Sequence, residues 1–268
     1  MHTRPTELAD WLRQRVTTSG ARGIVVGLSG GVDSAVVLRL AQMAVQDQVV
    51  GVLMPCHSDP RDEADAKLVA DHFNVSTVRI DLAPAYDRLV ADLKSAMSRL
   101  TPSLVQATAS EGTDIRARVP LANIKPRLRM SSLYYVANAM NYLVAGTGNR
   151  SELTIGYFTK FGDGGVDLLP IGHLLKSEVR VLARALDVPA AIIDKPPSAG
   201  LWLGQTDEEE MGFTYADLEN YLTNGPEAVS PALAMRIERL VRASEHKREL
   251  APTPEAERPV GFREADPP

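Results

Sequence analysis

One stretch near the N-terminus constrains the fold more than any other part of this sequence. Residues 23–28 read Gly-Ile-Val-Val-Gly-Leu, an apolar run rich in β-branched side chains, and Ser29-Gly30-Gly31 interrupts it. Such a run is typical of a strand buried on both faces of a parallel sheet. Residues 32–45 then carry a helical pattern. The order of strand, glycine turn and helix predicts a ligand site beyond the carboxyl end of the first strand.

The alternation of strand and helix continues along the chain. Further strands are predicted at 48–54, 76–82 and 142–145, and helices at 6–16, 60–73, 84–97, 121–140, 175–186, 214–222 and 231–246. We expect a loop or an irregular helix at 101–119. Strands separated by helices imply right-handed crossovers. The predicted fold class is therefore α/β, a doubly wound parallel sheet flanked by helices, Rossmann-like in character.

The predicted domain organisation is one domain over residues 1–250 and a surface tail over residues 251–268. The tail holds five prolines and few large apolar side chains. No internal repeat is visible.

Composition excludes several classes of protein. The formal net charge of −5 argues against a general nucleic-acid binder, although a local basic pocket for phosphates remains compatible with it. Cys56 is the single cysteine, so neither an internal disulfide nor a cysteine-based zinc site is expected. The charged N-terminal residues do not resemble a signal peptide, and no stretch is apolar enough to span a membrane. We expect a cytoplasmic protein without membrane partners.

The residues around the glycine turn indicate phosphate binding. Ser29-Gly30-Gly31-Val32-Asp33-Ser34 lies between the first strand and the helix, so its backbone amides and the helix N-terminus can converge on an anion. The two serine hydroxyls add donors, and Asp33 can hold a magnesium ion that bridges phosphate oxygens. The turn is neither a Walker A motif nor the Gly-x-Gly-x-x-Gly dinucleotide fingerprint.

These six residues resemble the PP-loop of the ATP pyrophosphatases, which split ATP between the α- and β-phosphates and adenylate their substrate. The resemblance implies an adenine nucleotide α-hydrolase-like fold. It also implies that ATP contacts the whole turn: Gly27, Leu28, Ser29, Gly30, Gly31, Val32, Asp33 and Ser34.

The second half of the chain resembles one branch of this group, the NAD synthetase family. The resemblance covers most of the chain, and its most diagnostic block is Gly-Tyr-Phe-Thr-Lys-Phe-Gly-Asp-Gly-Gly-Val-Asp at 156–167. Further similar blocks lie at 123–130, 146–152, 205–212 and 245–248. Val32 and Pro126 depart from the residues common in the family, and 101–118 does not align with it.

The family's roles carry over residue by residue. The resemblance implies that Thr147, Lys176 and Ser198 contact ATP, and that Asp33 and Glu152 hold magnesium. It implies that Asp33, Lys176 and Glu152 form the catalytic set. The positions that match deamido-NAD contacts are Arg127, Lys160, Asp167, His246 and Lys247. We further expect residues 196–212, rich in proline and glycine, to close as a lid.

The activity implied by the resemblance is the ATP-dependent amidation of deamido-NAD to NAD with ammonia, through an adenylated intermediate, with release of AMP and pyrophosphate. Magnesium is the implied cofactor and a homodimer the implied assembly. About twenty residues precede the first strand, so we expect no N-terminal glutaminase domain, and free ammonia or a separate glutaminase supplies the nitrogen.

Two alternatives remain. The first is another PP-loop ligase or amidotransferase acting on a different carboxylate or oxo group, against which the 156–167 block argues. A tRNA thiolase fits less well because the chain is acidic and has one cysteine. The second is a non-catalytic adenine-nucleotide sensor, which the retained carboxylates Asp33 and Glu152 disfavour.

Overall fold

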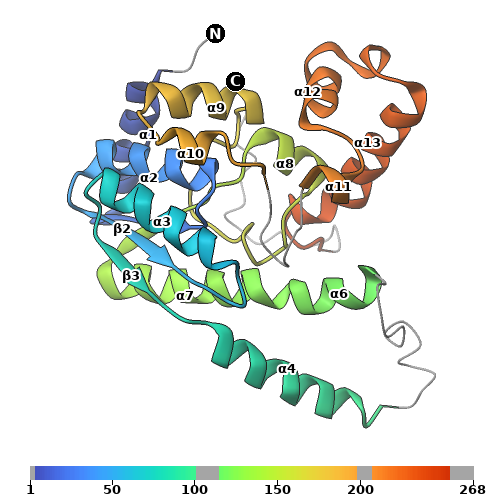
Figure 1. Cartoon of the computed structure of the whole chain (residues 1–268), viewed down its shortest axis with the longest axis horizontal. Helices are drawn as coiled ribbons and strands as arrows, with labels where there is room; N and C mark the ends of the chain where they lie inside the picture. Colours follow the sequence, from blue (N-terminus) through green and yellow to red (C-terminus); the bar gives the residue numbers. More distant parts are fainter. Residues whose placement is uncertain (1–3, 101–114, 198–206, 254–268) are drawn as a thin grey trace.

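The fold is built on one parallel sheet. The computed structural model describes residues 4–100, 115–197 and 207–253. Within them, four strands pair in the order β3-β2-β1-β4 (Figure 1), and every pairing is parallel. The strands are β1 (Gly23–Leu28), β2 (Val49–Leu53), β3 (Thr77–Arg79) and β4 (Tyr142–Ala145). The expected α/β class is confirmed, and β1 lies between β2 and β4 with its carboxyl end at the glycine turn.

Helices cover both faces of the sheet. On one face lie α1 (Pro5–Ser19), α2 (Val32–Val45), α3 (Pro60–His72), α9 (Lys176–Ala185) and α10 (Ala190–Ile193), and on the other lie α4 (Ala83–Met97), α6 (Ile115–Ala122) and α7 (Ile124–Met140). Ile24 and Val26 pack into the first layer, whereas Val25 packs into the second. This alternation follows from the two-residue period of a strand. All three side chains are fully buried, which stabilises the fold by about 2 kcal/mol each.

A smaller helical cluster stands beside the sheet. It comprises α8 (Arg150–Ile155), α11 (Asp207–Met211), α12 (Tyr215–Asn224), η1 (Pro226–Ala228), α13 (Pro231–Ala243) and η2 (Glu245–Lys247). Its core contains Ile155, Leu218 and Ile237, together with Met211 and Phe213. Because α8 follows β4 directly, this cluster is attached at the carboxyl edge of the sheet (Figure 1).

Two predicted elements differ from the observed ones for local reasons. The predicted strand 76–82 shortens to β3, because Pro55 has no amide hydrogen with which its neighbour β2 could extend the ladder. Most of the predicted helix 121–140 is α7, and its residues 121 and 122 belong to α6, which begins at Ile115 within the segment expected as a loop or an irregular helix. Pro126 has no amide hydrogen to bond the carbonyl of Ala122, so a new helix begins at Ile124 with Pro126 in its first turn.

The other predicted helix and strand boundaries differ little from the observed ones. The predicted helix 231–246 ends at Ala243 and continues as the turn η2. Three expectations fall partly outside the described residues: the loop or irregular helix predicted at 101–119 does so over 101–114, the lid predicted at 196–212 over 198–206, and the tail predicted at 251–268 over 254–268. No helix in the described ranges is long and apolar enough to cross a membrane.

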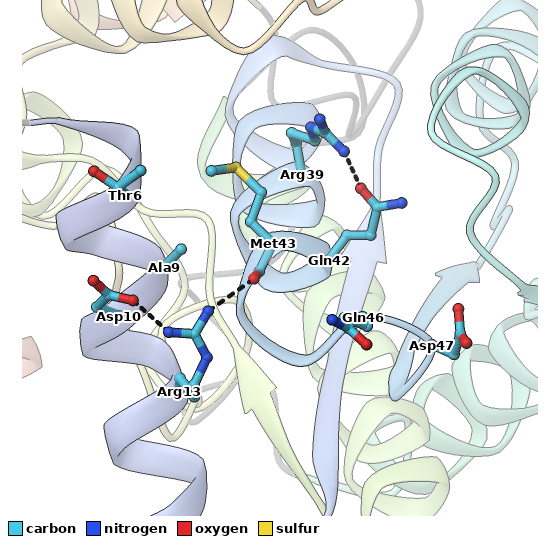
Figure 2. Close-up of a pocket in the computed structure, with 9 residues that line it drawn as sticks. All are labelled: Thr6, Ala9, Asp10, Arg13, Arg39, Gln42, Met43, Gln46 and Asp47. Carbon is cyan, nitrogen blue, oxygen red and sulfur yellow. Dashed lines mark hydrogen bonds and ion pairs between the residues drawn. The ribbon is translucent and has the colours of Figure 1, made fainter.

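Arg13 joins α1 to the end of α2. Its Nε donates to the Ala44 carbonyl over 3.0 Å. Its guanidinium also donates to the Met43 carbonyl over 3.1 Å (Figure 2). Asp10, one turn earlier on α1, pairs with the same guanidinium. Carbonyls at a helix C-terminus lack partners within the helix, so this cation caps the C-terminus of α2.

Candidate active site

A cavity of about 470 Å³ opens at the carboxyl ends of β1, β2 and β4. Its walls include the glycine turn, the start of α8, the first two turns of α9 and the 156–166 loop. A second hollow, between α1 and the end of α2, shares no lining residue with it (Figure 2). The cavity at the carboxyl ends of the strands lies where a parallel sheet of this kind binds ligands, as the sequence predicts.

The glycine turn has the geometry of an anion-binding loop. Gly30 adopts φ = +77°, and a Cβ there would lie 2.4 Å from the Asp62 carbonyl oxygen, so only glycine fits. The Ser34 hydroxyl donates to the Gly31 carbonyl over 2.9 Å and is buried. Ser29, Gly31 and Val32 line the cavity, whereas Gly30 and Ser34 do not. The last two therefore shape the turn, and the first three face the ligand space.

Three charged side chains meet at this turn. The Lys176 ammonium, from the first residue of α9, forms an ion pair with Asp33 and lies 3.3 Å from Glu152 Oε1. Its side chain is only 5% exposed. Burial alone would lower the pKa of Lys176, but the two carboxylates outweigh burial and raise it. Burial raises the pKa of Glu152 to about 7, although Lys176 opposes that rise.

Asn149 organises the two carboxylates and was not singled out from the sequence. Its buried amide nitrogen donates to Asp33 Oδ1 over 3.1 Å, and its oxygen accepts from the Glu152 amide over 3.1 Å. Glu152 in turn accepts from the Asn149 amide over 3.2 Å. This reciprocal pattern is a capping box, whose Asn-x-x-Glu spacing is visible in the sequence. The sequence therefore already contains the spacing that identifies Asn149 as a cap of α8.

A buried network of tyrosines and carboxylates continues from Glu152 into α11. The Tyr215 hydroxyl donates to Asp207 Oδ2 over 3.0 Å and lies 3.4 Å from Glu152 Oε1. The Tyr157 hydroxyl donates to Glu210 Oε2 over 2.7 Å and lies 3.2 Å from Asp207 Oδ1. Burial raises the pKa of Asp207, and Lys176 acts against that rise. The sequence identified Asp207–Glu210 only as an acidic block, because the partners come from distant segments.

The residues matched to deamido-NAD contacts form a second group. Lys247 lines the cavity and donates to the Gly156 and Phe158 carbonyls, each over 2.7 Å. Lys160 donates to the His246 carbonyl, and Arg127 donates to the Lys160 carbonyl over 3.3 Å. Arg127, Lys160 and His246 therefore lie together beside the cavity and are absent from its lining.

Asp167 lies at the end of β4, whereas the predicted ATP contacts that the structure describes lie at the glycine turn and in the cavity. Asp167 accepts from the Val144 amide and from the Tyr134 hydroxyl, over 2.8 and 2.9 Å, so in this structure it supports the end of β4. Thr147 and Lys176 line the cavity together with Gly27 and Leu28. Ser198 lies outside the described residues.

The fold and the site together define the class of protein to which this chain belongs. A glycine turn between β1 and α2, with a lysine and two carboxylates converging on it, is the arrangement of a nucleotide-binding α/β enzyme of the doubly wound type. Comparison with known proteins then identifies the family. The chain belongs to the NAD synthase family, whose model matches residues 5–251.

Individual relatives agree with this assignment. The chain is 51% identical over 248 residues to the NH(3)-dependent NAD(+) synthetase of Carboxydothermus hydrogenoformans, covering 92% of this chain and 95% of that protein. Among solved structures, it resembles the NMN synthetase of Francisella tularensis with a TM-score of 0.83 and 38% identity, covering 94% and 99% of the two chains. It also resembles the NH3-dependent NAD synthetase of Campylobacter jejuni, with a TM-score of 0.72 and 28% identity over 94% and 97%.

Proposed function

We propose that this protein uses ATP to activate the nicotinate carboxylate of deamido-NAD and then transfers ammonia to it, which forms NAD, AMP and pyrophosphate. The observation that carries the proposal is the convergence of Asp33, Lys176 and Glu152 on one side of the glycine turn. Membership of the NAD synthase family supports the same reaction.

In the first step, a carboxylate oxygen of deamido-NAD attacks the α-phosphorus of ATP, and the bond to the oxygen that bridges the α- and β-phosphates breaks. The electron pair of that bond leaves with pyrophosphate. The amides of the glycine turn and the start of α2 receive phosphate oxygens. Lys176, held at the turn by Asp33, neutralises charge that develops on the transferring group.

Magnesium fits the residues present. No cluster of three metal-ligating side chains occurs among the described residues, but Asp33 and Glu152 both reach one cation, the Lys176 ammonium. Magnesium is usually held by one or two carboxylates together with substrate phosphates. We propose that Asp33 and Glu152 hold it, where it supplies neutralising charge to phosphate oxygens.

In the second step, ammonia attacks the acyl carbon of the adenylate and AMP leaves. We propose that the cluster of Arg127, Lys160, His246 and Lys247 receives the dinucleotide, because its cations gather where the C-terminal turn η2 meets the 156–167 loop. Asp167, which supports β4, contributes to this site through the position of that loop.

The direct test is an assay of purified protein with deamido-NAD, ATP, magnesium and ammonium, in which NAD, AMP and pyrophosphate are measured together. Equal amounts of the three products are expected. AMP without NAD would point to a ligase for another carboxylate, and nucleotide binding without turnover would point to a sensor.

A second candidate substrate comes from the similarity to the Francisella NMN synthetase. Nicotinate mononucleotide carries the same reacting carboxylate but lacks the adenylate half of deamido-NAD. The assay is therefore run with both substrates, and we expect the larger kcat/KM with deamido-NAD. A larger kcat/KM with the mononucleotide would reverse the assignment.

We also propose that the protein is a homodimer that pairs through α4. This helix has no buried residue, and Leu89, Leu93 and Met97 form an apolar stripe at four-residue spacing with 38–42% exposure. Figure 1 shows α4 on the outer side of α7, away from the rest of the fold. A second copy of the same helix supplies the matching apolar surface that a twofold interface requires.

A further inference from the structure

The cavity wall formed by α9 and the end of α10 carries three cations. Lys176 and Arg180 are four residues apart on α9 and so lie on the same side of that helix, about 6 Å apart along its axis. Lys195 follows α10. All three line the cavity that contains the glycine turn.

Two of these cations are neutralised by protein carboxylates. Lys176 pairs with Asp33 and Glu152. Lys195 pairs with Asp62 and Asp65 of α3, over 2.8 and 2.5 Å. Each of these ammonium groups therefore has two anionic partners before any substrate binds.

Arg180 differs from both. Among the residues that the structure describes, its buried Nε has no hydrogen-bond partner and no carboxylate forms an ion pair with its guanidinium. Arg39 also has a buried Nε without a partner among the described residues, but it lines the second hollow, where its guanidinium bonds Gln42 and lies 5.1 Å from the Phe73 ring. An unpaired polar group costs roughly 1–3 kcal/mol, and more when it is charged. Such a group on the wall of a substrate cavity indicates an anionic ligand.

We propose that Arg180 binds the pyrophosphate group that leaves ATP. This assignment rests on the proposed function and adds a residue to it. When the bond between the α-phosphorus and its bridging oxygen breaks, negative charge grows on the β-phosphate. Arg180 lies one helical turn from Lys176 on α9 and lines the same cavity, and its planar guanidinium matches two phosphate oxygens at once.

The test compares Arg180→Gln with Arg184→Gln, a control on the same helix whose side chain is exposed. Binding of inorganic pyrophosphate with magnesium is measured by titration calorimetry, and KM is measured separately for ATP and deamido-NAD. We expect Arg180→Gln to weaken pyrophosphate binding and raise KM for ATP by roughly 10- to 100-fold. The KM for deamido-NAD and the affinity for AMP should stay near the wild-type values. Arg184→Gln should match the wild type throughout.

Arg180→Lys keeps the positive charge but lacks the planar guanidinium. Its affinity for pyrophosphate and its KM for ATP should therefore lie between those of the wild type and Arg180→Gln. Thermal unfolding of each variant shows whether the fold is intact, and the lysine variant serves as the test if the glutamine variant unfolds. Unchanged pyrophosphate binding, or an equal loss for ATP and deamido-NAD, would overturn the assignment. If the wild type fails to convert deamido-NAD but binds pyrophosphate in an Arg180-dependent way, the proposed substrate is wrong and the assignment of Arg180 stands.

Discussion

The side-chain amide of Asn149 donates a hydrogen bond to Asp33 Oδ1 over 3.1 Å, which joins the N-terminus of α8 to the first turn of α2. Asn149 is fully buried and also caps α8. One side chain therefore fixes the positions of both carboxylates proposed to hold magnesium.

Asn149→Ala should reduce both stability and turnover. Loss of the cap costs about 1 kcal/mol, and the polar groups left without a partner add roughly 1–3 kcal/mol. Urea unfolding and NAD formation measure the two effects. Ser230, whose side chain caps α13 by accepting from the Leu233 amide, provides the control. Ser230→Ala should lose a similar cap energy with full turnover; equal turnover in both variants would contradict the organising role of Asn149.

Gly30→Ala should abolish ATP binding. Both Gly30 and Gly20 have positive φ, at +77° and +70°, but a Cβ on Gly30 meets the Asp62 carbonyl whereas a Cβ on Gly20 meets nothing within 4 Å. Gly20→Ala should therefore lose only about 1–2 kcal/mol of stability, from the backbone strain of a positive φ. Calorimetric titration with ATP checks the difference. ATP binding by Gly30→Ala at wild-type strength would show that the shape of the turn does not matter for the nucleotide.

Asp33→Asn should lower kcat by at least about 100-fold, the usual effect of removing one preorganised electrostatic contact. Asn keeps the size of the side chain but leaves Lys176 with Glu152 as its remaining carboxylate partner. Pyrophosphate release under saturating substrates measures the loss, and a near-normal rate would remove Asp33 from the proposed metal site. Asp47→Asn, an exposed change after α2, should leave the rate unchanged.

Asp207 should make stability fall as pH rises. Burial raises its pKa in the folded protein above 3.8, so the unfolded chain releases its proton first. Between pH 3.8 and the folded pKa, the folded state binds more protons, and the free energy of unfolding therefore decreases with pH. Asp207→Asn cannot ionise and should lack this contribution.

Urea unfolding of the wild type and Asp207→Asn from pH 3.8 upward checks the sign. The stability advantage of the wild type over the variant should shrink with increasing pH. A constant difference over this range would mean that folding does not shift the protonation of Asp207.

Leu93→Glu should convert the proposed dimer into a monomer. The substitution places a charge in the middle of the α4 stripe, and charges are depleted in the core of a protein interface. Analytical ultracentrifugation measures the mass. Met235→Glu alters a 71% exposed side chain on α13 and should leave the dimer intact. A wild type that sediments as a monomer would refute the proposed interface directly.

The sequence by itself determined the sheet and the turn. The apolar run Gly23–Leu28, the glycines after it and the helical period that follows are local signals, because the backbone preference and the hydrophobic pattern at these positions are read from neighbours in the chain. They predicted the α/β class and the position of the phosphate turn. The resemblance of distant blocks to one family supplied Lys176 and Glu152, which local pattern alone does not connect to Asp33.

Only the tertiary structure decided which charges are neutralised. Lys176, Arg180 and Lys195 are similar cations in the sequence, yet two pair with carboxylates from α2, α8 and α3, while Arg180 has no carboxylate partner in the part of the chain that the structure describes. Contacts of this kind join residues more than a hundred positions apart, for example Lys195 and Asp62. Their strength depends on burial and distance, which exist only once the chain has folded.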